Sequence, residues 1–246
     1  MKMTLLEIVQ STLNSMDSDN VSNISDTIES MQVADVAKEV FYELSSYNDW
    51  DHLYKWIELE SVSDTSRPNY LKIPEKVGRM EHFKYEVTKA GDQKRTLSQI
   101  TYHSPEDFIE LVHSRNSSES NVTTVTNEDG VDMFIKNDKA PAIWTSFDDV
   151  HIVTDSYDSA EDTTLNGSKS SAWCRITPVW SSTNDFTPNL PIEFFPAYLA
   201  EVKSTCHLYF KQQVSQKDEQ RARRGLSHAR RKEKFDRGSK WIKLGR

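Results

Sequence analysis

The sequence predicts an α+β protein in which both ends of the chain form a discontinuous helical bundle and a mostly antiparallel β domain is inserted between them. Apolar residues recur at helical spacing near both termini, whereas the middle of the chain alternates apolar and polar residues. A strongly basic segment at the end of the chain predicts an extended C-terminal arm. The expected boundaries are 1–50 and 190–225 for the bundle, 51–189 for the β domain and 226–246 for the arm.

The helix expected from Asp26 to Tyr47 organises the bundle. Its apolar residues fall within one arc, and charged residues occupy the opposite side. Asp26 is the expected N-cap, and Glu29 would complete a capping box. Met31 and Tyr42 lie together off this arc, where they form a second buried seam, an ordinary surface pair or a contact with another subunit. The arc itself consists of Val33, Val36, Ala37, Val40, Phe41, Leu44 and Tyr47.

Two further helices are expected to cover this apolar arc, because a single amphipathic helix cannot bury it alone. Near the start of the chain, Thr4 and Glu7 have the spacing of a capping box and precede an apolar stripe. Near the end, a long amphipathic helix is expected to run until Gly225. The first stripe contains Leu6, Val9, Leu13 and Met16, and the second contains Phe195, Tyr198, Leu199, Val202, Cys206, Tyr209, Phe210 and Val214.

The segment between these helices predicts about six to nine strands. The clearest hairpin joins 122–126 to 131–135 through the turn at Asn127–Gly130. A second hairpin is expected to join 143–147 to 150–153. Ser104 and the proline after it predict the start of one short helix among the strands.

The formal net charge of −8 is distributed unevenly along the chain. Residues 217–246 contain 12 Lys/Arg and 4 Asp/Glu, a net charge of +8, which leaves 18 basic and 34 acidic residues elsewhere, a net charge of −16. No apolar run is long enough to cross a bilayer, so no membrane partner is expected. Cys174 and Cys206 are expected to be small buried hydrophobes in a reducing compartment.

Recognisable catalytic and cofactor-binding patterns are absent from the sequence. There is no Gly-rich phosphate loop, H-E-x-x-H, nucleophile elbow or paired Cys-x-x-Cys. One acidic cluster could hold a divalent cation through carboxylate oxygens, although its spacing matches no known calcium loop and acidic hairpin tips are common. We therefore expect no enzymatic activity, cofactor or metal. The cluster contains Asp148, Asp149, Asp155, Asp158, Glu161 and Asp162.

The basic C-terminal segment is the main candidate for binding. It could be a solvated disordered tail, a nucleic-acid-binding segment with salt-sensitive phosphate contacts, or an arm that docks on an acidic partner protein. Disorder accounts for the cations but not for the apolar residues at the very end, so we favour docking, with nucleic-acid binding as the alternative. The expected docking residues are Arg221, Arg223, Arg224, Arg230, Arg231, Lys232, Lys234, Lys240, Trp241, Ile242 and Leu244.

Three stretches carry a resemblance to a known family. They are the helix from Ile28 that ends in Asn48-Asp49-Trp50, the pair Trp144–Asp149 and Asp155–Asp158, and the helix from Ile192 that continues into the charged C-terminal segment. In these features, and over nearly the whole chain, the sequence resembles the head-to-tail adaptor, or tail tubular protein A, of short-tailed bacteriophages. The resemblance is one of architecture and short motifs, because the family has no short catalytic signature.

The resemblance implies a structural protein of the virion tail or neck that is assembled in the host cytoplasm. Such adaptors form a homo-oligomeric ring, commonly dodecameric, between the portal protein ring and the tail nozzle protein, and their C-terminal segment tends to embrace the portal. Double-stranded DNA passes through the ring without sequence-specific binding. The acidic body of this chain suits such a channel, because like charge keeps phosphates from adhering to its wall. Some relatives carry a cell-wall hydrolase activity, which no residue of this sequence identifies.

Overall fold

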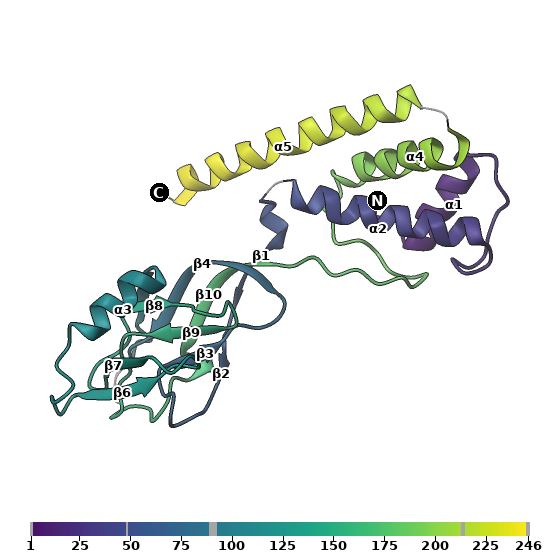
Figure 1. The fold of residues 1–246 in the computed structure, drawn as a ribbon. Helices are drawn as coiled ribbons and strands as arrows, with labels where there is room; N and C mark the ends of the chain where they lie inside the picture. The colour runs from purple at the N-terminus through teal and green to yellow at the C-terminus, as the bar shows by residue number, and fades with distance from the viewer. Residues whose placement is uncertain (1, 48, 89–92, 213–214, 245–246) are drawn as a thin grey trace. The chain divides into compact units, whose positions relative to one another are not determined.

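The computed structural model describes residues 2–47, 49–88, 93–212 and 215–244, and from residue 232 onward it describes the helical backbone alone. Within these ranges the protein is a mixed α+β protein with five helices and a large, mostly antiparallel sheet (Figure 1). The chain divides into two compact units, Met1–Leu53 together with Pro178–Arg246, and Tyr54–Thr177. We call them the helical unit and the β unit.

The three helices α1 (Leu5–Ser15), α2 (Ile28–Ser46) and α4 (Phe195–Lys211) share one hydrophobic core. The capping box of α1 between Thr4 and Glu7 is confirmed, since each side chain bonds to the backbone N–H of the other residue. In the core, Phe41 is fully buried, and the hydroxyl of Tyr198 donates to the carbonyl of Ala37 at 2.9 Å. This hydrogen bond joins α4 to the middle of α2 and satisfies a polar group in an apolar interior.

The expected N-cap of α2 is wrong by one residue. Thr27 caps the helix, and Ser30 rather than Glu29 completes the capping box. Asp26 instead accepts hydrogen bonds from the backbone N–H groups of Ser22 and Asn23, so it closes the preceding turn. Two adjacent residues can each cap a helix, and the preceding turn decides between them.

The boundary between the units differs from the expected one, because the segment after Thr177 belongs to the helical unit. Trp180 packs against Phe41 with ring centroids 5.3 Å apart, and Phe186 packs on Trp180 at 4.9 Å. At the other junction, the indole of Trp50 donates to the carbonyl of Leu44 at 2.9 Å. These aromatic residues lie on coil rather than on a helix, so helical spacing could not assign them to this core.

The expected end of the last amphipathic helix is also wrong. The helix α4 ends at Lys211, where Gln212 adopts a left-handed conformation with φ 50°. A separate helix, α5 (Gln216–Leu244), then runs through Gly225 without a break. Tyr209, expected on the buried stripe of α4, is 59% exposed. Val214, expected on the same stripe, lies outside the described residues.

The β unit has ten strands within the described ranges, against about six to nine expected. Eight form one sheet in the order β1-β10-β4-β5-β8-β9-β3-β2, and all pairs in it are antiparallel except β5 with β8. The strands of this sheet are β1 (Tyr54–Ile57), β2 (Glu60–Ser61), β3 (Tyr70–Lys72), β4 (Val77–Glu86), β5 (Leu97–Tyr102), β8 (Ile143–Thr145), β9 (His151–Thr154) and β10 (Ser170–Ile176).

Both expected hairpins are confirmed. The strands β6 (Val122–Thr126) and β7 (Asp132–Lys136) form a separate two-stranded sheet, and β8 pairs with β9 in the large one. The helix α3 (Pro105–His113) has Ser104 as its N-cap, as expected, and buries Phe108. No helix within the described ranges is long and apolar enough to cross a membrane.

Candidate functional site on the C-terminal helix

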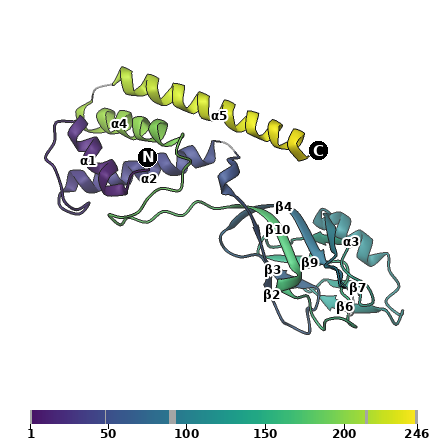
Figure 2. The same cartoon turned by 180° about the vertical axis from the view of Figure 1, so that it is seen from behind.

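One face of α5 is built from small and apolar residues that pack on the rest of the helical unit. Ala222 is fully buried, and Leu226 and Ala229 are partly buried against the core, which gives the spacing of a single helix face. Gly225 lies where α5 crosses α4, and a Cβ there would lie 2.6 Å from the Cβ of Ala197. Glycine is therefore required by the close approach of the two helices, which run alongside each other in Figures 1 and 2.

The arginine side chains that the sequence assigned to docking are exposed where they are described. They are Arg221, Arg223, Arg224, Arg230 and Arg231. Arg223 forms an ion pair with Glu219 one turn earlier, and the guanidinium of Arg230 lies 5.5 Å from the ring centroid of Tyr47. The side chains of Lys232, Lys234, Lys240, Trp241, Ile242 and Leu244 lie outside the described part of the structure, although their backbone is helical.

The charged residues at the start of α5 lie close to Glu201 on α4. Glu201 on α4 is half-buried, and burial, with the nearby carboxylates of Glu43 and Glu219, raises the pKa of Glu201. Arg223 acts in the opposite direction by favouring the charged form of Glu201. Arg230 lies over the ring of Tyr47, the C-cap of α2, so this contact and the packing of Gly225 on Ala197 hold the first half of α5 on its own unit.

A basic groove of about 630 Å³ lies between the start of α4 and the exposed side of α5. Lys217, Arg221, Arg224 and His228 line it together with a single carboxylate, that of Glu193. No ion pair involving Arg221 or Arg224 is found among the described residues. Guanidinium groups donate several hydrogen bonds in a fixed fork, so the groove can bind carboxylate or phosphate oxygens.

Met31 and Tyr42, the pair on α2 that lies off the main apolar arc, do not form a buried seam. Met31 is 43% exposed and Tyr42 is 39% exposed, and the ring of Tyr42 makes an edge contact with Phe41, with ring centroids 5.5 Å apart. An ordinary surface pair and a contact with another subunit both remain as interpretations.

The acidic cluster is divided among separate structural roles. Asp155 is buried and accepts hydrogen bonds from Arg115 at 2.7 Å and from the backbone N–H groups of Ala142 and Ile143 at 3.0 and 2.9 Å. Burial opposes its ionisation, but these bonds outweigh burial and lower the pKa of Asp155. Asp148 accepts from two backbone N–H groups in the turn before β9. Both carboxylates therefore stabilise the fold.

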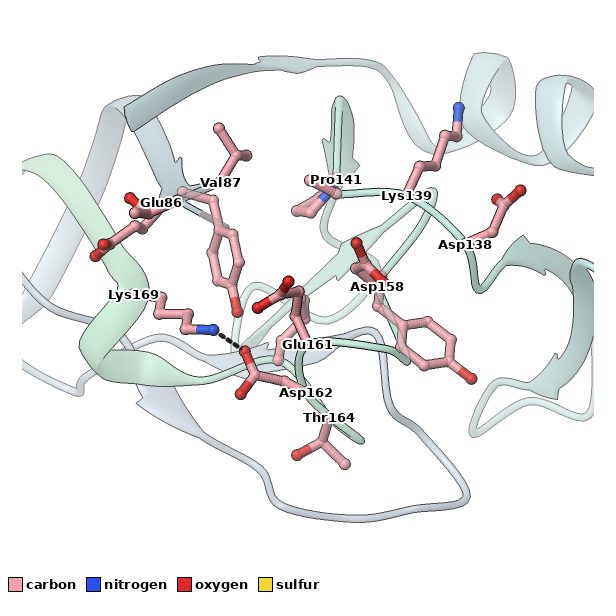
Figure 3. A pocket seen from close by; sticks show the side chains of 15 residues that line it. Glu86, Val87, Asp138, Lys139, Pro141, Asp158, Glu161, Asp162, Thr164 and Lys169 are labelled. Carbon is pink, nitrogen blue, oxygen red and sulfur yellow. Dashed lines mark hydrogen bonds and ion pairs between the residues drawn. The ribbon is translucent and has the colours of Figure 1, made fainter. Parts of the chain in front are cut away.

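Three other members of the cluster line a pocket of about 230 Å³ in the β unit (Figure 3). Asp162 forms an ion pair with Lys169 there, and Asp158 accepts a backbone hydrogen bond within its own loop. Glu161 and Glu86 also face this pocket. Within the described ranges, no group of three or more His, Cys, Asp or Glu side chains could hold a metal ion.

Both cysteines are buried and unpaired, as expected for small hydrophobes. Burial raises the pKa of both thiols to about 12. A thiol rather than a thiolate is therefore present at neutral pH, which makes Cys174 and Cys206 poor nucleophiles.

Sequence reasoning missed two features. It read Gly225 as a helix end, although a glycine can equally mark a close crossing of two helices. It also missed the aromatic residues Tyr54, Trp56 and Trp173, which meet on one face of the sheet. Their signal was the period-two spacing of two aromatic residues in a short strand.

Comparison with models of known protein families gives no match for this sequence, and comparison with curated proteins gives none either.

Proposed function

We propose that the protein is a structural component of a virion, a head-to-tail adaptor that assembles as a ring between a portal protein ring and a tail nozzle. The observation that carries this proposal is α5, a basic helix that is fixed to its own unit by one face and exposes arginines elsewhere. In the proposed role, the helical unit acts as a bundle and α5 acts as the arm that docks on the portal.

The division of charge supports docking of α5 on an acidic surface. Residues 217–246 have a net charge of +8, and the rest of the chain has a net charge of −16. A cationic segment steers its approach to an acidic partner, whereas buried apolar and aromatic anchors supply most of the affinity. Trp241, Ile242 and Leu244 have the chemistry of such anchors. The acidic remainder of the chain suits a channel through which double-stranded DNA must slide.

A binding titration against isolated portal protein tests this function. Replacing Trp241 and Ile242 by Ala should weaken docking by about 2 kcal/mol or more if they are hot spots. Neutralising Arg230 and Arg231 should mainly slow association and reduce its salt dependence. Tyr209→Ala provides a matched control, because Tyr209 is an exposed aromatic residue on α4 that is not part of the arm. Equal loss in the control and in the anchor variant would refute docking through the end of α5.

The basic groove favours a second candidate function, nucleic-acid binding. Its lining of Lys217, Arg221, Arg224 and His228 suits phosphate oxygens. The same titration against duplex DNA separates the two functions, because each phosphate contact makes the logarithm of the affinity fall with the logarithm of the salt concentration by a slope of about 0.9. Tight DNA binding that is lost with Arg221 and Arg224, together with portal binding indifferent to Trp241, would establish the second function instead.

A further inference from the structure

The outer face of β1, β10 and β4 in the β unit carries a cluster of aromatic and cationic side chains. We call it the aromatic face and define it by Tyr54, Trp56, Trp173, Arg79 and Lys84. Trp56 is 51% exposed, although a tryptophan side chain has a large apolar surface that is usually buried in a core or an interface. β1 is also an edge strand of the sheet. A contiguous cluster of aromatic residues beside an edge strand, unlike a single exposed ring, is a candidate interaction surface.

The strand register builds this face. Trp56 lies opposite Trp173, and Tyr54 lies opposite the residue two positions further along β10, so all three rings point to the same side of the sheet. The rings of Trp56 and Trp173 are 5.4 Å apart, and those of Tyr54 and Trp173 are stacked at 5.8 Å. The Nζ of Lys84 lies 5.4 Å from the ring centroid of Trp56. The rings therefore fix one another, which lowers the entropy lost on binding.

The aromatic face has a positive net charge, whereas the β unit as a whole has a negative net charge. Arg79 donates hydrogen bonds to the Tyr54 hydroxyl and to the carboxylate of Glu81, each at 2.7 Å. The negative charge of Glu81 is therefore counted with the face. With Lys84 and Arg175, the formal charges of these groups sum to +2. Residues 54–177 contain 14 Lys/Arg and 21 Asp/Glu, a net charge of −7. A polyanion such as nucleic acid would be repelled by the unit as a whole, whereas a small acidic protein surface complements the face.

The β unit itself presents such an acidic surface at the β6–β7 hairpin. Glu128, Asp129 and Asp132 are exposed there, and Arg67 pairs with Glu128, so these groups have a net charge of −2. We call this the acidic tip. In Figure 1 the hairpin lies on the side of the unit away from β1. The aromatic face and the acidic tip thus belong to different surfaces of one unit and cannot meet within a single copy.

From this complementarity we infer that the aromatic face binds the acidic tip of a second copy of this chain. Such a contact is heterologous, because the two copies use different surfaces, and repeated contacts of this kind close into a ring when the rotation between copies allows it. The contact has the composition of an interface centre, in which Trp, Tyr and Arg are enriched. The inference rests on the proposed ring and assigns one of its subunit contacts.

Sedimentation velocity of the free full-length chain tests the contact. Measurements should use about 0.15 M salt, which screens the long-range repulsion between acidic bodies. The chain should associate with a Kd between about 1 µM and about 1 mM. Trp56→Ala, Lys84→Glu and Asp129→Lys should each raise the Kd at least about tenfold. Tyr102→Ala and Lys94→Glu are the matched controls on the same unit, and both should leave the Kd unchanged.

A mixing experiment shows whether the contact is heterologous. Trp56→Ala chains keep an intact tip, and Asp129→Lys chains keep an intact face, so a mixture of the two should form dimers but nothing larger. Wild-type chains that stay monomeric at about 1 mM would overturn the inference. An equal loss of self-association in Tyr102→Ala would also overturn it. So would quenching of the tryptophan fluorescence by a single-stranded oligonucleotide that disappears in Trp56→Ala, because this would assign the face to nucleic acid.

The two proposals fail separately. Chains that dock on the portal but do not associate through the aromatic face would overturn this contact and leave the proposed function intact. Chains that associate through the face but never bind a portal ring would overturn the proposed function alone.

Discussion

Replacing Gly225 by Ala tests the close packing of α5 on α4. In an exposed helix interior this change stabilises by about 1 kcal/mol, because alanine is the better helix former. At Gly225, however, the new Cβ would lie 2.6 Å from the Cβ of Ala197 and 3.3 Å from its Cα, whereas ordinary contact begins at 3.4 Å. The atom that Cβ meets first belongs to a short side chain that cannot rotate away, so the helices themselves must move apart.

The expected cost combines two opposed terms. Overpacking of a tight contact costs about 1–3 kcal/mol, and the gain in helix propensity offsets about 1 kcal/mol of it. Gly225→Ala should therefore lower the free energy of unfolding by up to about 2 kcal/mol. Ser227→Ala is the control, because Ser227 is exposed on the same helix and its replacement should be neutral or slightly stabilising.

Urea denaturation measures the free energy of unfolding, and limited trypsin digestion shows whether α5 stays packed on α4. Lifting α5 should speed cleavage after Arg221, Arg223 and Arg224, because a protease needs a locally unfolded segment of backbone. If Gly225→Ala proves as stable and as resistant to trypsin as Ser227→Ala, then α5 does not cross α4 at Gly225 and the anchored-helix argument fails.

Three further predictions concern the two cores and their ionisable groups. Phe41→Ala should cost about 3–5 kcal/mol and give unfolded or insoluble protein, whereas Lys38→Ala should leave the urea midpoint unchanged; equal midpoints would mean that α2 buries a different face. Burial is the main cause that lowers the pKa of His52 to about 4, so the unfolded state binds more protons between about pH 4 and 6.5 and stability should fall as the pH drops through that window. His52→Gln should remove this part of the pH dependence in urea titrations, and an unchanged slope would contradict it. Asp155→Ala should cost about 3–5 kcal/mol because it leaves Arg115 unpaired, and a midpoint within about 1 kcal/mol of wild type would show that solvent reaches that guanidinium.

Local patterns predicted the helices well because they depend on residues close in sequence. The spacing of Thr4 and Glu7 fixed both hydrogen bonds of a capping box, and the arc through Phe41 is buried as expected. Tyr47, at the end of the same arc, is exposed and instead carries Arg230 on its ring. Periodicity identifies the apolar face of a helix, but it does not say how far along that face a neighbouring helix extends.

The candidate site was harder to predict because its shape depends on tertiary contacts. The cations of α5 are visible in the sequence, but Gly225 has two incompatible interpretations, a left-handed helix end or a close crossing. Only the position of Ala197, 28 residues earlier, decides between them. The structural roles of the acidic cluster were hard to predict for a related reason, since nothing local shows that Arg115 reaches Asp155 across 40 residues.

The anchoring of α5 changes what its arginines can contribute to a partner. A flexible basic tail would lose backbone freedom on docking, at about 1–2 kcal/mol for each residue that becomes fixed. Here the backbone around Arg221 and Arg224 is already helical and is held on α4 through Gly225, so this cost is met when the protein folds. Preorganised cations of this kind contribute to affinity as well as to the rate of approach. Neutralising Arg221 and Arg224 should therefore slow association and also speed dissociation, whereas neutralising a cation on a flexible segment should change the association rate alone.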